Sequence, residues 1–96
     1  MDVFKWLQEW YMRNCDGDWE HCYGVQIGTL DNLGWYIDID LTDTDLEDEV
    51  FGTISLERCQ NDWIYCHVEN NIYKGCGGTA NLNEIIAIFQ NLCNEK

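Results

Sequence analysis

The feature that most constrains the fold is a strict two-residue alternation in segment 35–42. Its two sets of residues are Trp35, Ile37, Ile39 and Leu41 on one side and Tyr36, Asp38, Asp40 and Thr42 on the other. A strand with this period buries one set and turns the other outward. Segment 23–28 alternates in the same way, and Asp31-Asn32-Leu33-Gly34 between them has Asp and Gly where a turn favours them. The sequence therefore predicts a β-hairpin with one apolar face and one acidic face.

Segments of helical period stand at both ends of the chain. Residues 3–13, with Trp6 and Trp10, and residues 82–93 each gather their apolar side chains on one stripe. Asn81 and Glu84 have the spacing of a capping box at the start of the second helix.

Three more strands are predicted between these helices, over residues 50–59, 63–69 and 72–74, with a two-residue turn at Asn70-Asn71. The order α-β-β-β-β-β-α predicts a single α+β domain over residues 1–96. We expect an antiparallel β-meander of about five strands, with the N-terminal and C-terminal helices packed on one face of the sheet.

The other face of such a sheet would expose aromatic residues set among carboxylates. Its expected members are Tyr36, Asp38, Asp40, Thr53, Ser55, Glu57, Trp63, Tyr65, His67 and Tyr73. Large aromatic side chains beside charges on an open sheet are typical of a protein-binding surface.

The formal net charge of −13 is unevenly distributed. No Lys or Arg lies between Arg13 and Arg58, whereas twelve acidic residues do. The stretch after the hairpin contributes Asp43, Asp45, Glu47, Asp48 and Glu49 to them. Such a surface repels a phosphate backbone and attracts a basic protein surface. We therefore expect a protein partner and no nucleic acid.

Six cysteines would suit a disulfide framework only in an exported protein. The N-terminal MDVFKWLQEWY lacks the basic start, apolar run and cleavage site of a signal peptide. No segment approaches the roughly 20 apolar residues that span a bilayer. The sequence predicts a cytoplasmic protein with reduced thiols and no membrane segment.

Metal-binding and catalytic motifs are incomplete. The Cys and His residues of 15–22 and 59–67 are spaced more widely than zinc ligands usually are, and neither 16–20 nor 38–45 completes a calcium loop. Segment 75–78 is glycine-rich but lacks the spacing of a phosphate-binding loop. Cys66 and His67 are strand neighbours that point to opposite faces, which argues against a catalytic pair. We expect no enzyme activity, cofactor or metal; a small zinc-binding, calcium-binding or hydrolytic domain is the alternative.

Six stretches of the chain resemble the immunity protein 53 family of bacterial polymorphic toxin systems. They are WLQEWY (6–11), CDGDWEHCYG (15–24), LDNLGW (30–35), IDLTDTDLED (39–48), DWIYCHVE (62–69) and GCGGTANLNEIIAIF (75–89). The family pattern has proline at the positions of Leu33 and Thr79, where this chain departs from it. The resemblance implies an antitoxin that binds and neutralises a cognate toxin domain, and it assigns no interface residues.

The charge and aromatic patterns together predict where that toxin would bind. The predicted residues are Tyr36, Asp38, Asp40, Asp43, Asp45, Glu47, Asp48, Glu49, Glu57, Trp63, Tyr65 and His67. The expected partner is a basic toxin domain, such as a nuclease whose substrate cleft becomes occluded. A homodimer through the open sheet face is equally consistent with exposed aromatics.

The free energy of unfolding should be the same with and without reductant, because the thiols are expected to be free. Urea denaturation under both conditions measures this. A native disulfide typically contributes about 2–4 kcal/mol, so a loss of that size on reduction would refute the prediction. Thiol titration of the unfolded, unreduced protein should count six thiols per chain.

Overall fold

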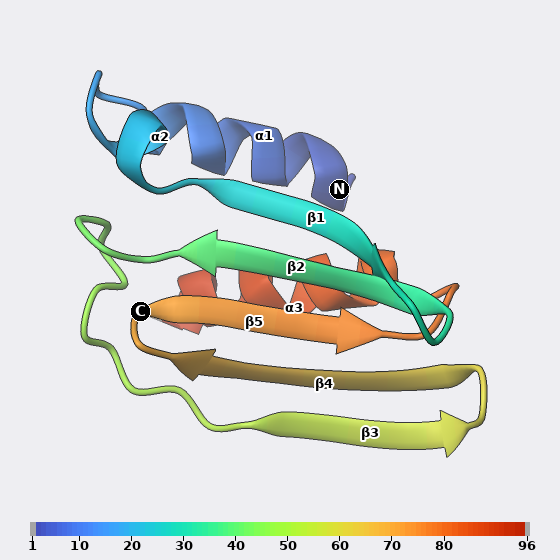
Figure 1. Cartoon of the computed structure of the whole chain (residues 1–96). Coiled ribbons are helices and arrows are strands. Elements are labelled where there is room, and N and C mark those ends of the chain that lie inside the picture. The colour runs from blue at the N-terminus through green and yellow to red at the C-terminus, as the bar shows by residue number, and fades with distance from the viewer. Residues whose placement is uncertain (1, 96) are drawn as a thin grey trace.

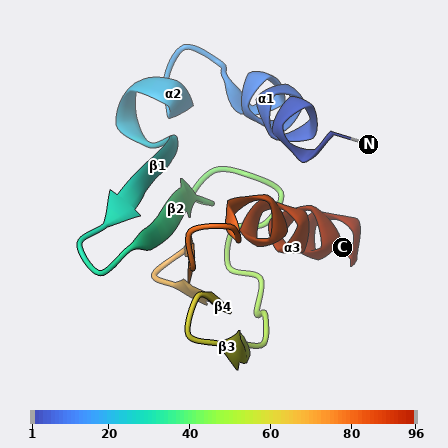
Figure 2. The same ribbon diagram turned by 90° about the vertical axis from the view of Figure 1, so that its right-hand side faces the viewer.

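The computed structural model describes residues 2–95, which form a five-stranded antiparallel sheet and three helices (Figure 1). The helices are α1 (Val3–Asn14), α2 (Trp19–Cys22) and α3 (Leu82–Glu95). The strands are β1 (Val25–Leu30), β2 (Gly34–Asp40), β3 (Ile54–Cys59), β4 (Asp62–Glu69) and β5 (Ile72–Gly77). Figure 2 shows α1 and α3 together on one side of the sheet, with α2 beside the β1 edge. The predicted α+β class, with an N-terminal and a C-terminal helix on an antiparallel sheet, is confirmed.

The strand order differs from a purely sequential meander, because β5 lies between β2 and β4. The order is β1-β2-β5-β4-β3, so β2 pairs with β5 and β3 forms an outer edge. The chain must then travel from the middle of the sheet to its far edge, and residues 41–53, here called the connector, make that crossing (Figure 1). Strand β3 begins at Ile54 and not at 50 as predicted, because residues 50–53 belong to the crossing.

The two predicted hairpin turns are present and depend on left-handed backbone conformations. Asn70 and Asn71 have φ values of 54° and 61°, as a two-residue turn between antiparallel strands requires. Between β1 and β2, Leu33 has a φ of 65°. Proline is fixed near a φ of about −65°, so a proline could not adopt the conformation of Leu33.

Helix α2 is a single turn that the sequence analysis did not predict. The Asp16 carboxylate accepts hydrogen bonds from the amides of Asp18 and Trp19, both at 2.9 Å. The Glu20 carboxylate accepts from the amides of Asp16 at 2.9 Å and Gly17 at 2.8 Å. Hydrogen bonds from the backbone lower the pKa of both carboxyls. The carboxylates that resembled calcium ligands thus bind the chain's own backbone.

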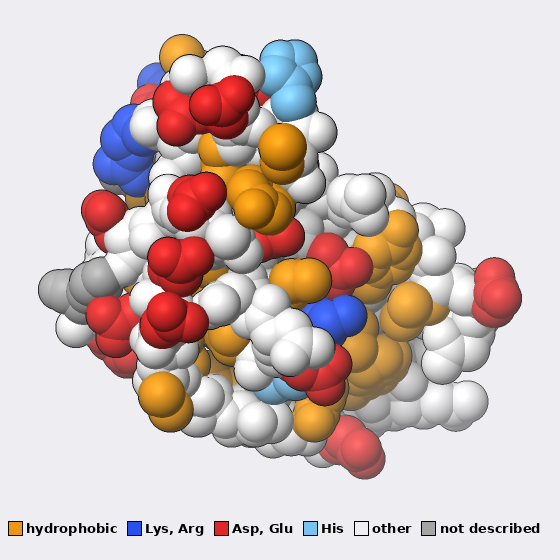
Figure 3. All heavy atoms as spheres, turned by 60° about the vertical axis from the view of Figure 1, so that its left-hand side comes forward, with side chains coloured by type: hydrophobic (Ala, Val, Ile, Leu, Met, Phe, Trp, Pro, Cys, Tyr) orange, Lys and Arg blue, Asp and Glu red, His pale blue; other side chains and the backbone are white. Residues whose placement is uncertain are grey.

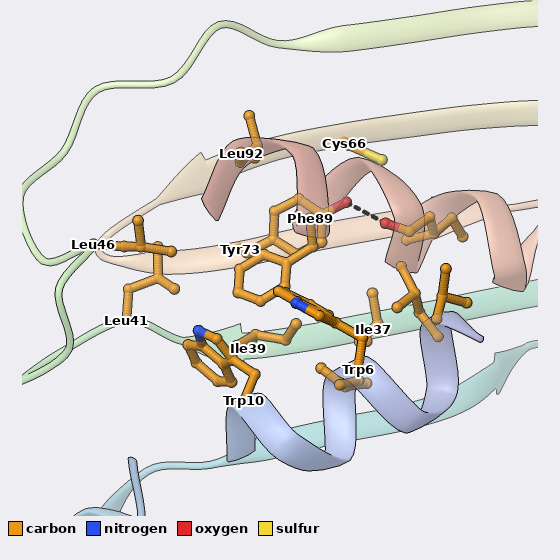
Figure 4. Close-up of a cluster of buried hydrophobic side chains, with 14 of the residues drawn as sticks. Trp6, Trp10, Ile37, Ile39, Leu41, Leu46, Cys66, Tyr73, Phe89 and Leu92 are labelled. Carbon is orange, nitrogen blue, oxygen red and sulfur yellow. Dashed lines mark hydrogen bonds between the residues drawn. The ribbon is translucent and has the colours of Figure 1, made fainter. Parts of the chain in front are cut away.

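The core lies between the sheet and the two long helices (Figure 4). Trp10 of α1 is 6% exposed, and its ring meets Phe89 edge-on at a centroid distance of 5.1 Å. It also contacts Trp19, which α2 places in the core. The Tyr73 hydroxyl donates a 2.8 Å hydrogen bond to the Ile85 carbonyl, which satisfies its buried oxygen. The prediction that Trp6 and Trp10 are core residues is confirmed.

Tyr73 itself was predicted on the open face, and that prediction is wrong because Tyr73 is fully buried. The turn at Asn70-Asn71 pairs Val68 with Tyr73 across β4 and β5. Directly paired residues in antiparallel strands lie on the same face, so Tyr73 follows Val68 to the helix side.

Replacing Trp10 by alanine should lower the free energy of unfolding by about 3–5 kcal/mol, because it removes a buried aromatic side chain. Met12→Ala, on the 69% exposed Met12 of the same helix, is the control and should cost less than about 0.5 kcal/mol. Urea denaturation measures both changes. Equal stability of the two variants would contradict the core position of Trp10.

Leu33→Asn should raise the free energy of unfolding by about 0.5–1 kcal/mol, because asparagine tolerates a positive φ better than leucine. Leu33 is 73% exposed, so little packing is lost. Leu33→Pro should lower stability by more than about 1 kcal/mol, since its ring excludes the native φ. Thermal denaturation of the three proteins checks the order, and a Pro variant as stable as the parent would refute the turn geometry.

Candidate functional site

The side of the sheet that carries neither α1 nor α3 is here called the open face, and it faces the viewer in Figure 1. Strand pairing and alternation fix its members. They are Gln26, Gly28 and Leu30 of β1; Gly34, Tyr36, Asp38 and Asp40 of β2; Ile72, Lys74 and Cys76 of β5; Trp63, Tyr65, His67 and Glu69 of β4; and Ser55 and Glu57 of β3. Seven of the twelve predicted toxin-binding residues share this face: Tyr36, Asp38, Asp40, Glu57, Trp63, Tyr65 and His67.

Most aromatic side chains of the open face lie at one end of it and most acidic side chains at the other, with Glu57 as the exception because it pairs with Trp63. Toward the turn between β3 and β4, Tyr36, Cys76 and Tyr65 form one row across three strands, and Trp63 stands beyond them. Toward the connector, Asp40 pairs with Ile72, which in turn pairs with Glu69. The face therefore has an aromatic end and an acidic end.

The aromatic end is built on a glycine and a small thiol. A Cβ at Gly28 would lie only 2.5 Å from Cε1 of Tyr36, so the Tyr36 ring can lie across β1 only because position 28 has no side chain. The Cys76 thiol donates to the Tyr65 carbonyl at 3.6 Å. Burial, followed by the nearby Asp38 charge, raises the pKa of Cys76, which keeps this thiol neutral. A groove of about 560 Å³ beside Trp63 is also lined by Glu57.

The connector is held firmly beside the acidic end. Leu46 is 3% exposed and Leu41 is fully buried, so both side chains anchor this stretch in the core. The Asp48 amide donates a 2.8 Å hydrogen bond to the Asn71 side-chain oxygen, and the Asn71 side-chain NH2 donates a 3.1 Å bond to the Asp48 carboxylate. These contacts hold the backbone of the connector in place, and its acidic side chains project from it into solvent.

The predicted residues of the connector are all exposed, namely Asp43, Asp45, Glu47, Asp48 and Glu49. Figure 3 shows acidic side chains gathered along the end of the molecule that α2 and the connector form. The Glu47 carboxylate accepts a 3.1 Å hydrogen bond from the Asp43 amide, and Asp48 is engaged with Asn71. Part of this charge thus also stabilises the loop that carries it.

Tyr23, which was not among the predicted residues, lies near carboxylates of both the connector and the open face. Partial burial raises the pKa of Tyr23, and the charges of Asp43, Cys22, Asp40 and Glu47 raise it further. The phenol is therefore within electrostatic reach of carboxylates from β2 and from the connector. No sequence period links Tyr23 to these carboxylates, because the chain turns at Gly24, which has a φ of 126°.

Lys74 was also left out of the predicted face. Register places it between Asp38 of β2 and His67 of β4, in the middle of the open face. Within residues 2–95, neither residue forms an ion pair with it.

Arg58, in contrast, is fully engaged away from the open face. It forms ion pairs with Asp62 and Glu84, which also accept hydrogen bonds from the Asn81 side chain in place of the predicted capping box. The bonds from Arg58, and then from Asn81, lower the pKa of Asp62 to about 2.

The candidate metal and catalytic residues do not come together. Among residues 2–95, no group of three His, Cys, Asp or Glu side chains could hold a metal ion. Cys66 is buried on the helix side of β4, whereas its neighbour His67 lies on the open face, as predicted. All six thiols are free in the structure.

The architecture is that of a small α+β protein whose sheet is covered by helices on one side only. A family model described as Immunity protein 53 matches residues 4–94, and the chain belongs to this family. Membership makes it an immunity protein, a class that binds a toxin partner. No curated protein and no solved structure matches the chain. None of the helices within residues 2–95 has the length and apolar character needed to cross a membrane.

Proposed function

We propose that this chain neutralises a basic toxin domain by covering it with the open face and the connector. The observation that carries the proposal is the placement of seven predicted residues on one uncovered face, with the acidic connector fixed at one end of it. Like charge excludes nucleic acid from this surface, whereas a basic cleft complements it.

The two ends of the open face would act at different stages of binding. The acidic end and the connector attract the toxin over a distance and speed the encounter. The rings of Trp63, Tyr65 and Tyr36 then become buried and slow dissociation, as aromatic anchors do in other interfaces.

The mode of action would be occlusion. A toxin that acts on nucleic acid needs a basic substrate cleft, and an acidic protein seated there excludes the substrate. In this proposal the immunity protein works in the cytoplasm as a single domain, without catalysis, cofactor or metal.

Neutralising Asp43, Asp45 and Glu47 together should slow association and flatten its dependence on salt, since exposed charges act through a screened field. The substitutions Asp43→Asn, Asp45→Asn and Glu47→Gln keep an acceptor oxygen for the loop, and Asp48 is spared because it binds Asn71. Surface plasmon resonance at two salt concentrations, against the cognate toxin domain, measures the rates.

The matched control neutralises three exposed carboxylates outside the proposed surface, through Glu9→Gln, Asp31→Asn and Glu95→Gln. It makes the same change in net charge and should alter association much less. Equal effects of the two triple variants would refute local steering by the connector.

Trp63→Ala should raise the dissociation rate constant, with a loss of about 2 kcal/mol or more in binding free energy. Its association should change little, because no charge is removed. Unchanged dissociation of this variant, once circular dichroism shows it folded, would move the interface away from the aromatic end.

A further inference from the structure

The acidic end of the open face contains a groove of about 200 Å³, between the chain that follows α2 and strands β1, β2 and β5. Tyr23, Asp38, Asp40 and Ile72 are among the residues that line it. Two carboxylates, an aromatic ring and an aliphatic side chain thus meet in one hollow of the face that the helices leave uncovered.

We propose that this groove is a socket for one arginine side chain of the toxin. The inference rests on the proposed function and adds to it the chemistry of a specific contact.

The two carboxylates have free capacity for a cation. Asp38 and Asp40 occupy alternate positions of β2, so both point to the open face, about 7 Å apart along the strand. Asp40 uses Oδ1 to accept the Thr42 amide at 3.0 Å, and Asp38 accepts no hydrogen bond from residues 2–95. A guanidinium carries five N–H donors in a planar fork and can bond these oxygens from one position.

The other walls of the groove favour arginine over lysine. Tyr23 is 39% exposed, and a planar guanidinium can stack on such a ring while its methylene stem packs on Ile72. An ammonium has no plane to stack and is more strongly hydrated, so it gains less in such a site.

The cation has to come from a partner, because no Lys or Arg of residues 2–95 lines the groove. Arg58 is paired with Asp62 and Glu84. Lys74 stands opposite Asp38 in register but forms no ion pair with it within residues 2–95. Asp43 lies close enough to act on Tyr23 and adds to the negative charge around the groove.

The test measures the Kd of the cognate toxin domain for the parent, for Asp38→Asn/Asp40→Asn and for the control Glu9→Gln/Asp31→Asn, which changes the net charge equally. Asparagine keeps an oxygen for the Thr42 amide, and Asp38→Asn alone serves if the double variant does not fold. We expect the groove variant to bind about 30-fold more weakly or worse, and the control to stay within about threefold of the parent.

Double-mutant cycles then identify the toxin residue. Each toxin arginine and lysine is replaced by methionine and combined with Asp38→Asn, and one arginine should show a coupling of about tenfold. Coupling to a lysine alone overturns the choice of arginine. A tight complex in which groove and control variants bind alike overturns the socket and leaves the proposed function standing. A folded parent that does not bind the toxin overturns the proposed function, and the socket with it.

Discussion

The close packing of α3 on the central strand β5 is the contact on which the rest of the structure depends. A Cβ at Gly75 would collide with Ile85, so the helix can lie this near to the strand only because glycine occupies that position. The Tyr73 hydroxyl fits beneath the helix and finds its acceptor in the Ile85 carbonyl. Helix α1 packs beside α3 through contacts of Trp6 and Trp10 with Phe89. Both long helices therefore lie on the same side of the sheet. The opposite face is left without a covering helix.

The position of β5 also decides where the acidic residues are displayed. Because β5 occupies the place beside β2, the chain leaving β2 must pass around the end of the sheet before it can form β3. Two buried leucines and the link between Asp48 and Asn71 hold it there. A loop that is already ordered loses less conformational entropy when a partner binds, which favours affinity. In the proposed function, the residues that satisfy this topological need would therefore also prepare the binding surface.

Much of the fold could be predicted from the periodicity of apolar residues, because a strand or helix that buries one face needs an apolar side chain at each position of that face. The hairpin of β1 and β2, the two long helices and the inward side of β4 all follow from such patterns. Pairing between distant strands leaves no local trace, so the insertion of β5 could not be predicted in this way. Tyr73 was misplaced because an aromatic residue suits either face; only the pairing of Val68 with Tyr73 across the Asn70-Asn71 turn decides the matter.

The candidate site, like the fold, could be predicted in part. Residues of β2, β3 and β4 were placed correctly on the open face because alternation along one strand suffices for that. Tyr23 was missed because its position depends on the single turn of α2 and on the φ of Gly24, which brings together segments with no common period. Lys74 was missed with Tyr73, since one register fixes both.

The strand order has a consequence for how the chain reaches its native state. The sheet consists of two units formed by neighbours in sequence, β1 with β2 and β3 with β4 and β5, joined at the single seam between β2 and β5. Each unit can close through a short turn, whereas the seam brings together segments separated by residues 41–71 and must meet the entropy of closing that loop. We expect the two units to form first and the seam to form late. Substitutions in the β1–β2 turn should then slow folding, whereas substitutions along the seam should act mainly on unfolding.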